Sequence, residues 1–308
     1  MMNMPKTTFI LNAKKRKSRN IISKIERVFS AYPIQIAATA YAGHATMLVS
    51  EAVRSGAEIV VSVGGDGTLN EVLNGLIRGC EALGKPPEKV GLGILPTGSG
   101  NDFVKNLVGS RTPESLEESI RESRSSAIDI GLAAFTSLLQ VPEKRYFINI
   151  ADVGIGGVIA EKLSRHRSWL GPTFTYQRAI ASALWDYSPE ILVVETNKET
   201  IVSPMMSLVV ANGKFFGNGL GIAPNARLDD GLMEVVMLKN ISLSDYLRQL
   251  PKLKRCEVLT HAEVSYASSV SVTVAASNGG SLPIDMDGEY VGMTPVTFSV
   301  LSRFVTVF

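Results

Sequence analysis

One stretch of the chain constrains its fold more than any other. Residues 60–71 begin as an apolar run, pass through three glycines grouped around Asp66, and continue with apolar residues at helical spacing. This order predicts a buried strand, a tight turn and the beginning of a helix. Glycine permits positive φ angles and close approach to the main chain, and a helix begins with unpaired N–H groups. Such a turn therefore suits a phosphate.

A second glycine-rich turn follows at residues 95–103, again directly after an apolar run. Two such turns in one domain indicate a nucleotide-binding site. The pattern is not a P-loop, because no lysine follows the glycines at the required spacing. Gly91 and Gly93 lack the third glycine of the dinucleotide-binding motif, and we treat that partial match as chance.

Up to about Ile130, short apolar strands alternate with helices. The predicted strands are 7–11, 34–39, 59–63 and 90–95, and the predicted helices are 21–29, 45–53, 69–77, 101–107 and 114–122. This alternation predicts βαβ units and a mainly parallel sheet. Ligands of such sheets bind beyond the carboxyl ends of the strands, where both glycine-rich turns lie.

After about Ile130, strands follow one another with few helices between them. The predicted strands are 146–150, 191–196, 206–211, 233–238, 258–266, 270–275 and 297–300, and the predicted helices are 158–164, 176–185 and 243–250. This pattern predicts an antiparallel β-sandwich. We therefore expect an α/β nucleotide-binding domain over residues 1–131 and a larger β-sandwich domain over residues 132–296.

Composition narrows the range of partners. The 308 residues are 45% hydrophobic and 19% charged, which is typical of a globular protein with a sizeable core. A net charge of +2 argues against nucleic acid as a partner. Cys80 and Cys256 lie far apart without metal-ligand spacing, which predicts a reduced, cytoplasmic protein. No apolar run reaches the roughly 18 residues needed to span a bilayer, so we expect any membrane contact to be at the surface.

Carboxylates in three turns are candidates for chemistry. Asp66 could bind a metal or a hydrogen-bond donor beside nucleotide phosphates, or it could satisfy its own backbone as turn aspartates do. The segment 223–232 carries Asp229 and Asp230, which could bind a hard cation through oxygen ligands or simply form a hairpin turn.

Residues 284–289 bring three more carboxylates together. Asp285 and Asp287 would share one face of a strand, and Glu289 follows Gly288. One of these groups could take a proton from an alcohol, as a phosphoryl-transfer site requires. The alternative is a solvated hairpin tip. The basic residues from Lys14 to Arg19 are equally open, since they could bind phosphate or an anionic membrane, or form a solvated loop.

Four motifs in order give the chain a family resemblance. Gly-Gly-Asp-Gly-Thr-Leu-Asn-Glu stands at 64–71, Pro-Thr-Gly-Ser-Gly-Asn-Asp-Phe at 96–103, an Ala-Pro to Asp-Gly-Leu element at 223–232, and Asp-Gly-Glu at 287–289. Together they resemble the diacylglycerol kinase catalytic family in its bacterial soluble lipid kinase branch. The first motif alone is less specific, because nicotinamide-nucleotide kinases and phosphofructokinases carry a similar one.

The resemblance implies a site in a cleft between the two domains and a last strand, 297–308, that returns to the first domain. It implies that Glu289 is the general base. It implies ATP as phosphate donor, with catalytic Mg²⁺ carried by ATP. It also implies a structural Mg²⁺ site made by Asp230 with the carbonyls of Arg227 and Leu232. The residues that it places around the nucleotide are Asn12, Lys14, Arg16, Thr39, Gly64, Gly65, Asp66, Gly67, Thr68, Leu69, Asn70, Gly98, Ser99 and Asn101.

Our primary hypothesis is an ATP-dependent, magnesium-requiring kinase that phosphorylates a hydroxyl of diacylglycerol or a related lipid at a membrane surface, with Glu289, Asp66 and Asp287 as catalytic residues. A soluble-metabolite kinase of the NAD kinase type is one alternative. A non-catalytic regulator that binds lipid or nucleotide is another. The sequence leaves the choice of lipid and the formation of a homodimer open.

Overall fold

The computed structural model describes residues 4–12, 18–165, 178–183, 185 and 187–308. Lys14 and Arg16, two of the predicted nucleotide contacts, lie outside these residues. The chain divides into two compact units, one formed by the chain up to Asp129 together with Arg303–Phe308, the other by Ile130–Ser302. No helix within the described residues is long and apolar enough to cross a bilayer.

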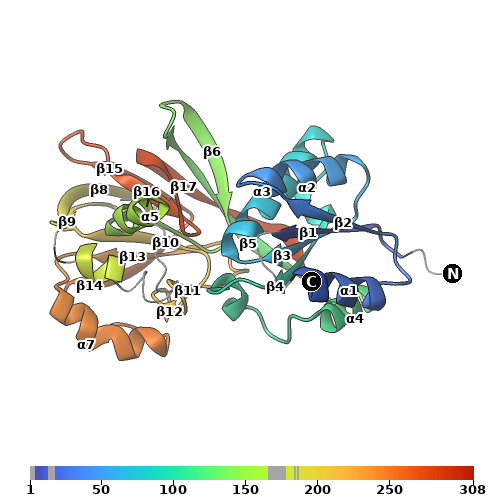
Figure 1. Ribbon diagram of the computed structural model, residues 1–308. Coiled ribbons are helices and arrows are strands. Elements are labelled where there is room, and N and C mark those ends of the chain that lie inside the picture. The colour runs from blue at the N-terminus through green and yellow to red at the C-terminus, as the bar shows by residue number, and fades with distance from the viewer. Residues whose placement is uncertain (1–3, 13–17, 166–177, 184, 186) are drawn as a thin grey trace. The chain divides into compact units, whose positions relative to one another are not determined.

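The first unit is built on a parallel sheet in the order β4-β3-β1-β2, and the end of the last strand, β17, runs parallel to β4 (Figure 1). The predicted parallel α/β architecture is therefore confirmed. Its strands are β1 (Thr7–Asn12), β2 (Ile34–Thr39), β3 (Ile59–Gly64) and β4 (Gly91–Pro96). Its α-helices are α1 (Ser18–Val28), α2 (His44–Arg54), α3 (Asp66–Ala82) and α4 (Pro113–Arg121).

Two glycines explain how closely α2 and α3 pack. A Cβ atom at Gly75 would lie 2.6 Å from the carbonyl oxygen of Thr46, and one at Gly79 would lie 2.8 Å from Cβ of Val53. Because the two glycines are four residues apart, they lie on one face of α3, where larger side chains would push α2 away. This close packing holds the second half of α3 against α2.

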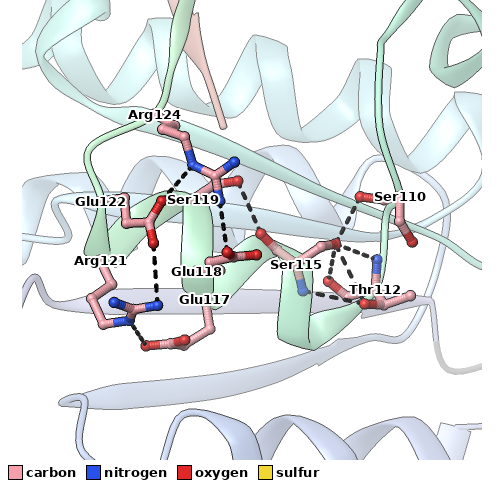
Figure 2. Close-up of polar contacts among 9 residues, drawn as sticks. All are labelled: Ser110, Thr112, Ser115, Glu117, Glu118, Ser119, Arg121, Glu122 and Arg124. Atoms are coloured by element: carbon pink, nitrogen blue, oxygen red, sulfur yellow. Dashed lines mark hydrogen bonds and ion pairs between the residues drawn. The ribbon is translucent and has the colours of Figure 1, made fainter.

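Helix α4 begins where its sequence predicts. Thr112 and Ser115 form a reciprocal capping box: the N–H of Ser115 donates to Thr112 Oγ1 at 3.2 Å, and the N–H of Thr112 donates to Ser115 Oγ at 3.0 Å (Figure 2). Pro113 then occupies the first turn, where its missing N–H costs nothing. A cap of this kind stabilises a helix by about 1 kcal/mol. The exposed pair of Arg121 with Glu117 adds little.

The predicted helix over residues 101–107 is wrong. Only a short 3₁₀ turn, η2 (Phe103–Asn106), forms there. Asn101 has a positive φ of 49°, and side chains of this segment bond to its own backbone: Asn101 Nδ2 donates to the carbonyl of Gly98 at 3.1 Å and Asn106 Nδ2 to that of Phe103 at 2.9 Å. Such local bonds compete with α-helix formation.

The second unit is an antiparallel β-sandwich, as predicted. One sheet has the order β14-β13-β10-β7-β16-β17, and β17 also pairs with β15, which continues through β8 to β9. The strands from β14 to β17 and the strands β15, β8 and β9 all contribute to the apolar core. In this core the rings of Phe147 and Phe298 meet edge to face, with their centroids 5.9 Å apart. Helices α5 (Ile155–Arg165) and α7 (Leu243–Lys254) accompany the strands.

The strands of the second unit are β5 (Ser126–Ser137), β6 (Pro142–Phe147), β7 (Ile150–Gly154), β8 (Glu190–Thr196), β9 (Thr200–Met205), β10 (Ser207–Ala211), β11 (Phe215–Phe216), β12 (Leu220–Gly221), β13 (Met233–Leu238), β14 (Val264–Ser269), β15 (Ser271–Ala276), β16 (Pro283–Met286) and β17 (Glu289–Val307). Two predictions in this list need correction. The strand expected at 258–266 begins only at Val264, after a turn in which the N–H of Val264 donates to the carbonyl of His261. The strand expected at 146–150 is interrupted between β6 and β7.

Candidate functional site

The turn between β3 and α3, which we call the glycine corner (residues 64–68), presents the beginning of a helix. No side chain of the described residues caps α3 at Gly65, and the N–H of Leu69 makes the first helical bond, to the carbonyl of Gly65 at 3.0 Å. The first N–H groups of a helix have no partner within it and carry the positive end of its dipole. The corner therefore has the geometry and polarity that bind an anion.

The second glycine-rich turn lies directly against this corner. The N–H groups of Thr97 and Gly98 donate to the carbonyl of Gly64 at 2.8 and 3.1 Å. A Cβ atom at Gly98 would lie only 2.5 Å from Cα of Gly65, so a side chain at position 98 would separate the two turns. The carboxylate of Asp66 adds a third link, because its Oδ1 accepts the N–H of Phe103 at 3.2 Å.

Other predicted nucleotide contacts lie at the same edge of the first sheet. Asn12 and Thr39 are the last residues of β1 and β2 and are paired in register. Asn12 Nδ2 donates to Thr68 Oγ1 at 3.4 Å. Asn70 is fully buried within α3, where Asn74 donates to it. Ser99 is exposed, and Asn101 Oδ1 is buried with no partner among the described residues.

Sequence reasoning missed a charged pair in the second turn. Asp102 is 8% exposed, and its Oδ1 accepts a bond from Lys105 Nζ at 2.5 Å. The same ammonium also donates to the carbonyl of Gly100 at 3.0 Å. Because Lys105 follows the glycines by five residues rather than one, no phosphate-binding lysine motif signals it. The pair nevertheless places an ammonium group, bound to the Asp102 carboxylate, on the turn that touches the glycine corner.

In the second unit, Asp287 and Gly288 form the two-residue turn between β16 and β17. Met286 pairs with Glu289, and both turn residues have positive φ, 50° and 85°, as a tight antiparallel hairpin requires. The carboxylate of Asp287 accepts three backbone N–H groups, those of Ile148, Asn149 and Ile150, at 3.0, 3.0 and 3.1 Å. These bonds hold the corner at which β6 ends and β7 begins, and they account for the interrupted strand.

Glu289 is the first residue of β17 and forms an ion pair with Arg145 of β6. The glutamate side chain is 39% exposed and that of Arg145 is 21% exposed. An ion pair of this kind restricts the rotamers of the carboxylate and fixes the direction in which it points. The two residues are separated by most of the second unit in sequence, so no sequence pattern linked them.

Asp285 lies opposite Asp152 of β7 in the antiparallel register. Burial raises the pKa of Asp152 to about 7, although a 2.6 Å bond from Ser207 Oγ opposes the shift. Burial, followed by the charge of Asp152, raises the pKa of Asp285 well above its usual range. Neither Asp152 Oδ1 nor Asp285 Oδ1 has a hydrogen-bond partner among the described residues.

The predicted cation loop, residues 223–232, is held by hydrogen bonds to a buried glutamate. Glu234 is 5% exposed and accepts the N–H and the side-chain Nδ2 of Asn225 at 2.9 and 2.8 Å. Asp230 is exposed, and its Oδ1 accepts the N–H of Leu232 at 3.0 Å. The described residues contain no group of three or more His, Cys, Asp or Glu side chains placed to hold a metal. A cation here would therefore need backbone carbonyls and water beside Asp230, a ligand set that Mg²⁺ accepts.

Two protein-family models match the chain. The description "Diacylglycerol kinase catalytic domain" matches residues 6–133, and "YegS C-terminal NAD kinase beta sandwich-like domain" matches residues 149–308. Among curated relatives, a diacylglycerol kinase of Bacillus subtilis (strain 168) is 29% identical over 297 residues, covering 95% of this chain and 90% of the relative. A diacylglycerol kinase of Staphylococcus haemolyticus (strain JCSC1435) is 27% identical over 294 residues, covering 95% and 83%.

Solved structures share the fold. A diacylglycerol kinase from Bacillus anthracis str. Sterne superimposes with a TM-score of 0.70 at 20% identity, covering 100% of this chain and 97% of that one. Yeast NADH kinase complexed with NADH gives a TM-score of 0.52 at 8% identity, covering 99% and 84%. At these identities the likeness concerns the fold alone.

Proposed function

The chain belongs to the family that joins a diacylglycerol kinase catalytic domain to a YegS C-terminal domain, and from this membership we propose that it is an ATP-dependent lipid kinase. It transfers the γ-phosphate of ATP to a hydroxyl group of diacylglycerol or a related lipid. The observation that carries the proposal is the uncapped beginning of α3 at the glycine corner, in contact with a second glycine-rich turn.

The first unit binds the nucleotide. Phosphate oxygens accept the N–H groups at the beginning of α3, and the helix dipole favours their charge by about 0.3–1 kcal/mol, more where water is excluded. Lys105 lies on the neighbouring turn, where its ammonium group is paired with the carboxylate of Asp102. Gly64–Thr68, Gly98, Ser99 and Asn101 surround the phosphates, the buried Leu69 and Asn70 support this turn from within α3, and Asn12 and Thr39 lie at the same sheet edge.

The second unit supplies the acid–base group. Glu289 accepts the proton of the lipid hydroxyl as its oxygen attacks the γ-phosphorus, a role that fits a partly exposed carboxylate at the beginning of a strand. Arg145 holds that carboxylate in one orientation. Asp287 acts as a positioning residue, because its three backbone bonds fix the turn from which Glu289 projects.

We expect Mg²⁺ at two positions, one with the bound ATP and one at Asp230. Mg²⁺ carried by ATP would supply neutralisation of the phosphate charge. A second ion would be held by Asp230 with the carbonyls of Arg227 and Leu232, where it would stabilise the loop rather than take part in the reaction. The exposed carboxylate of Asp230 fits such a site. The enzyme acts from the cytoplasm on lipid at a membrane surface.

A phosphorylation assay with labelled ATP tests the proposal. Diacylglycerol and other hydroxyl lipids in mixed micelles are compared with nicotinamide dinucleotides, with and without Mg²⁺. We expect magnesium-dependent labelling of a lipid. Labelling of a dinucleotide alone would instead assign a soluble-metabolite kinase, which shares this fold. ATP binding without labelling of any acceptor would assign a non-catalytic regulator.

A further inference from the structure

Strands β5 and β6 form a hairpin that stands out from the other strands of the second unit (Figure 1). The N–H of Ser137 donates to the carbonyl of Val141 at 2.9 Å, and Gln140, with a φ of 60°, closes the turn. We call residues 138–141 the hairpin tip. Its apolar side chains are open to solvent: Leu139 is 85% exposed, Val141 50% and Leu138 48%.

Single exposed apolar residues are common on protein surfaces, but adjacent ones on a protruding turn are not. The tip contains no charged residue, and charge returns on β6 with Glu143 and Lys144. Behind the tip, Ala134, Phe135, Pro142 and Val296 line part of an open groove of about 590 Å³. Phe135 and Val296 are buried at its base, and Glu143 and Lys144 also line it, so the exposed apolar surface is confined to the tip.

The small area of the hairpin tip indicates whether its partner is another protein or a lipid bilayer. A stable protein interface buries about 800 Å² on each partner and involves about 20–30 residues a side. The hairpin tip is far smaller than that, so it does not suffice for a dimer. A narrow apolar protrusion with a lysine behind it instead matches a bilayer, in which the apolar end enters the acyl boundary and the ammonium meets the phosphates.

We propose that the hairpin tip inserts into the surface of the lipid bilayer and docks the enzyme on the membrane that contains its substrate. This inference rests on the proposed lipid kinase function. Strand β6 also carries Arg145, the partner of Glu289, six residues beyond Leu139. At about 3.3 Å per residue, the four residues from Val141, the last residue of the tip, to Arg145 span about 13 Å. The hairpin thus sets the height of the base above the membrane.

The uncharged tip predicts how binding responds to salt. Insertion of Leu138, Leu139 and Val141 depends on apolar burial, which moderate ionic strength changes little. Binding through a basic loop would weaken steeply as salt screens the charges. Flotation with phosphatidylcholine vesicles at low and high ionic strength should therefore give nearly equal bound fractions. Release by salt would overturn the proposal.

The decisive variant is Leu138→Ser/Leu139→Ser. We expect its affinity for phosphatidylcholine vesicles to fall by at least about tenfold, because two apolar side chains no longer enter the bilayer. Val108→Ser is the matched control, since Val108 is a 96% exposed apolar residue of the first unit and should leave binding unchanged. Turnover of a short-chain, water-soluble diacylglycerol should be unaffected in both variants, whereas turnover of long-chain lipid in vesicles should fall only in the double variant.

The other outcomes are equally informative. Unchanged vesicle binding by the double variant, or an equal loss in the control, would overturn the proposal. So would a wild-type dimer that the double variant converts to a monomer, because the tip would then belong to an interface between copies. If the wild type floats with vesicles through its tip but does not phosphorylate soluble diacylglycerol, the docking surface stands and the proposed kinase function fails.

Discussion

The glycine corner of the first unit and the acidic turn of the second (residues 285–289) use the same residue pair, Asp-Gly, in opposite ways. At the glycine corner the groups proposed to bind phosphate are main-chain N–H groups, and the carboxylate of Asp66 links two turns through Phe103. At the acidic turn the group proposed to act in catalysis is a side chain, Glu289, while the carboxylate of Asp287 accepts three backbone N–H groups. The corner should therefore be sensitive to added atoms, and the acidic turn to lost charge.

The largest effect is expected from Glu289→Gln, which keeps the size of the side chain and removes its basicity. We expect kcat to fall by about 10²–10⁴-fold, the usual contribution of a general base, with ATP affinity unchanged. Steady-state kinetics combined with equilibrium ATP binding separates the two. Normal turnover in this variant would mean that another group accepts the proton. The acidic turn would then not act through the charge of Glu289.

Asp152→Asn probes the buried carboxyl pair. Folding raises the pKa of Asp152 from 3.8 to about 7, so the folded protein keeps a proton that the unfolded chain has lost. The resulting stability is fully present below about pH 4 and is lost as the pH rises through 7. The difference in free energy of unfolding between wild type and variant should change over this range by up to about 4 kcal/mol.

Chemical denaturation at a series of pH values measures that difference. Asp285→Asn is the matched variant, because the two carboxyl groups face each other and share their titration. If the free energy of unfolding depended on pH in the same way in the wild type and both variants, the prediction would be wrong. Asp152 and Asp285 would then be ionised in the folded protein, and burial would not raise their pKa values.

Gly98→Ala tests the first unit with a single added carbon. Its Cβ would lie 2.5 Å from Cα of Gly65, so the two turns must separate. We expect ATP to bind about 10–100-fold more weakly, equivalent to the roughly 1–3 kcal/mol that overpacking costs. Gly280→Ala is the control, because the nearest atom there is the end of the Asn278 side chain, which can move. Calorimetric ATP titration would contradict the prediction if both variants bound like wild type.

The smallest effect is expected at Arg145, which is proposed to act through its ion pair with Glu289. Arg145→Ala should lower kcat by about tenfold, because the carboxylate loses the partner that orients it. Arg145→Lys should restore part of the loss, since it keeps the charge but not the planar geometry. Equal kcat in all three proteins would make the ion pair irrelevant to turnover.

The sequence predicted an element well where the residues that determine it are close to it in the sequence. The β3 run and the glycines that follow it gave the strand, the turn and the helix of the glycine corner. The predicted helix at 101–107 failed because Asn101 and Asn106 bond to their own backbone, a competition that apolar spacing does not record. The strand predicted at 146–150 failed because its interruption is made by Asp287, a residue far along the chain.

The sequence by itself determined the parallel α/β fold, the antiparallel sandwich and the positions of the glycine corner and the acidic turn. These follow from backbone preferences and periodicity, which act over a few residues. Only the tertiary structure decided that Lys105 pairs with Asp102 beside the corner, that Asp152 faces Asp285, that Arg145 holds Glu289, and that the hairpin tip is exposed. Most of these depend on strand register and burial, which the whole chain sets together and no short segment encodes.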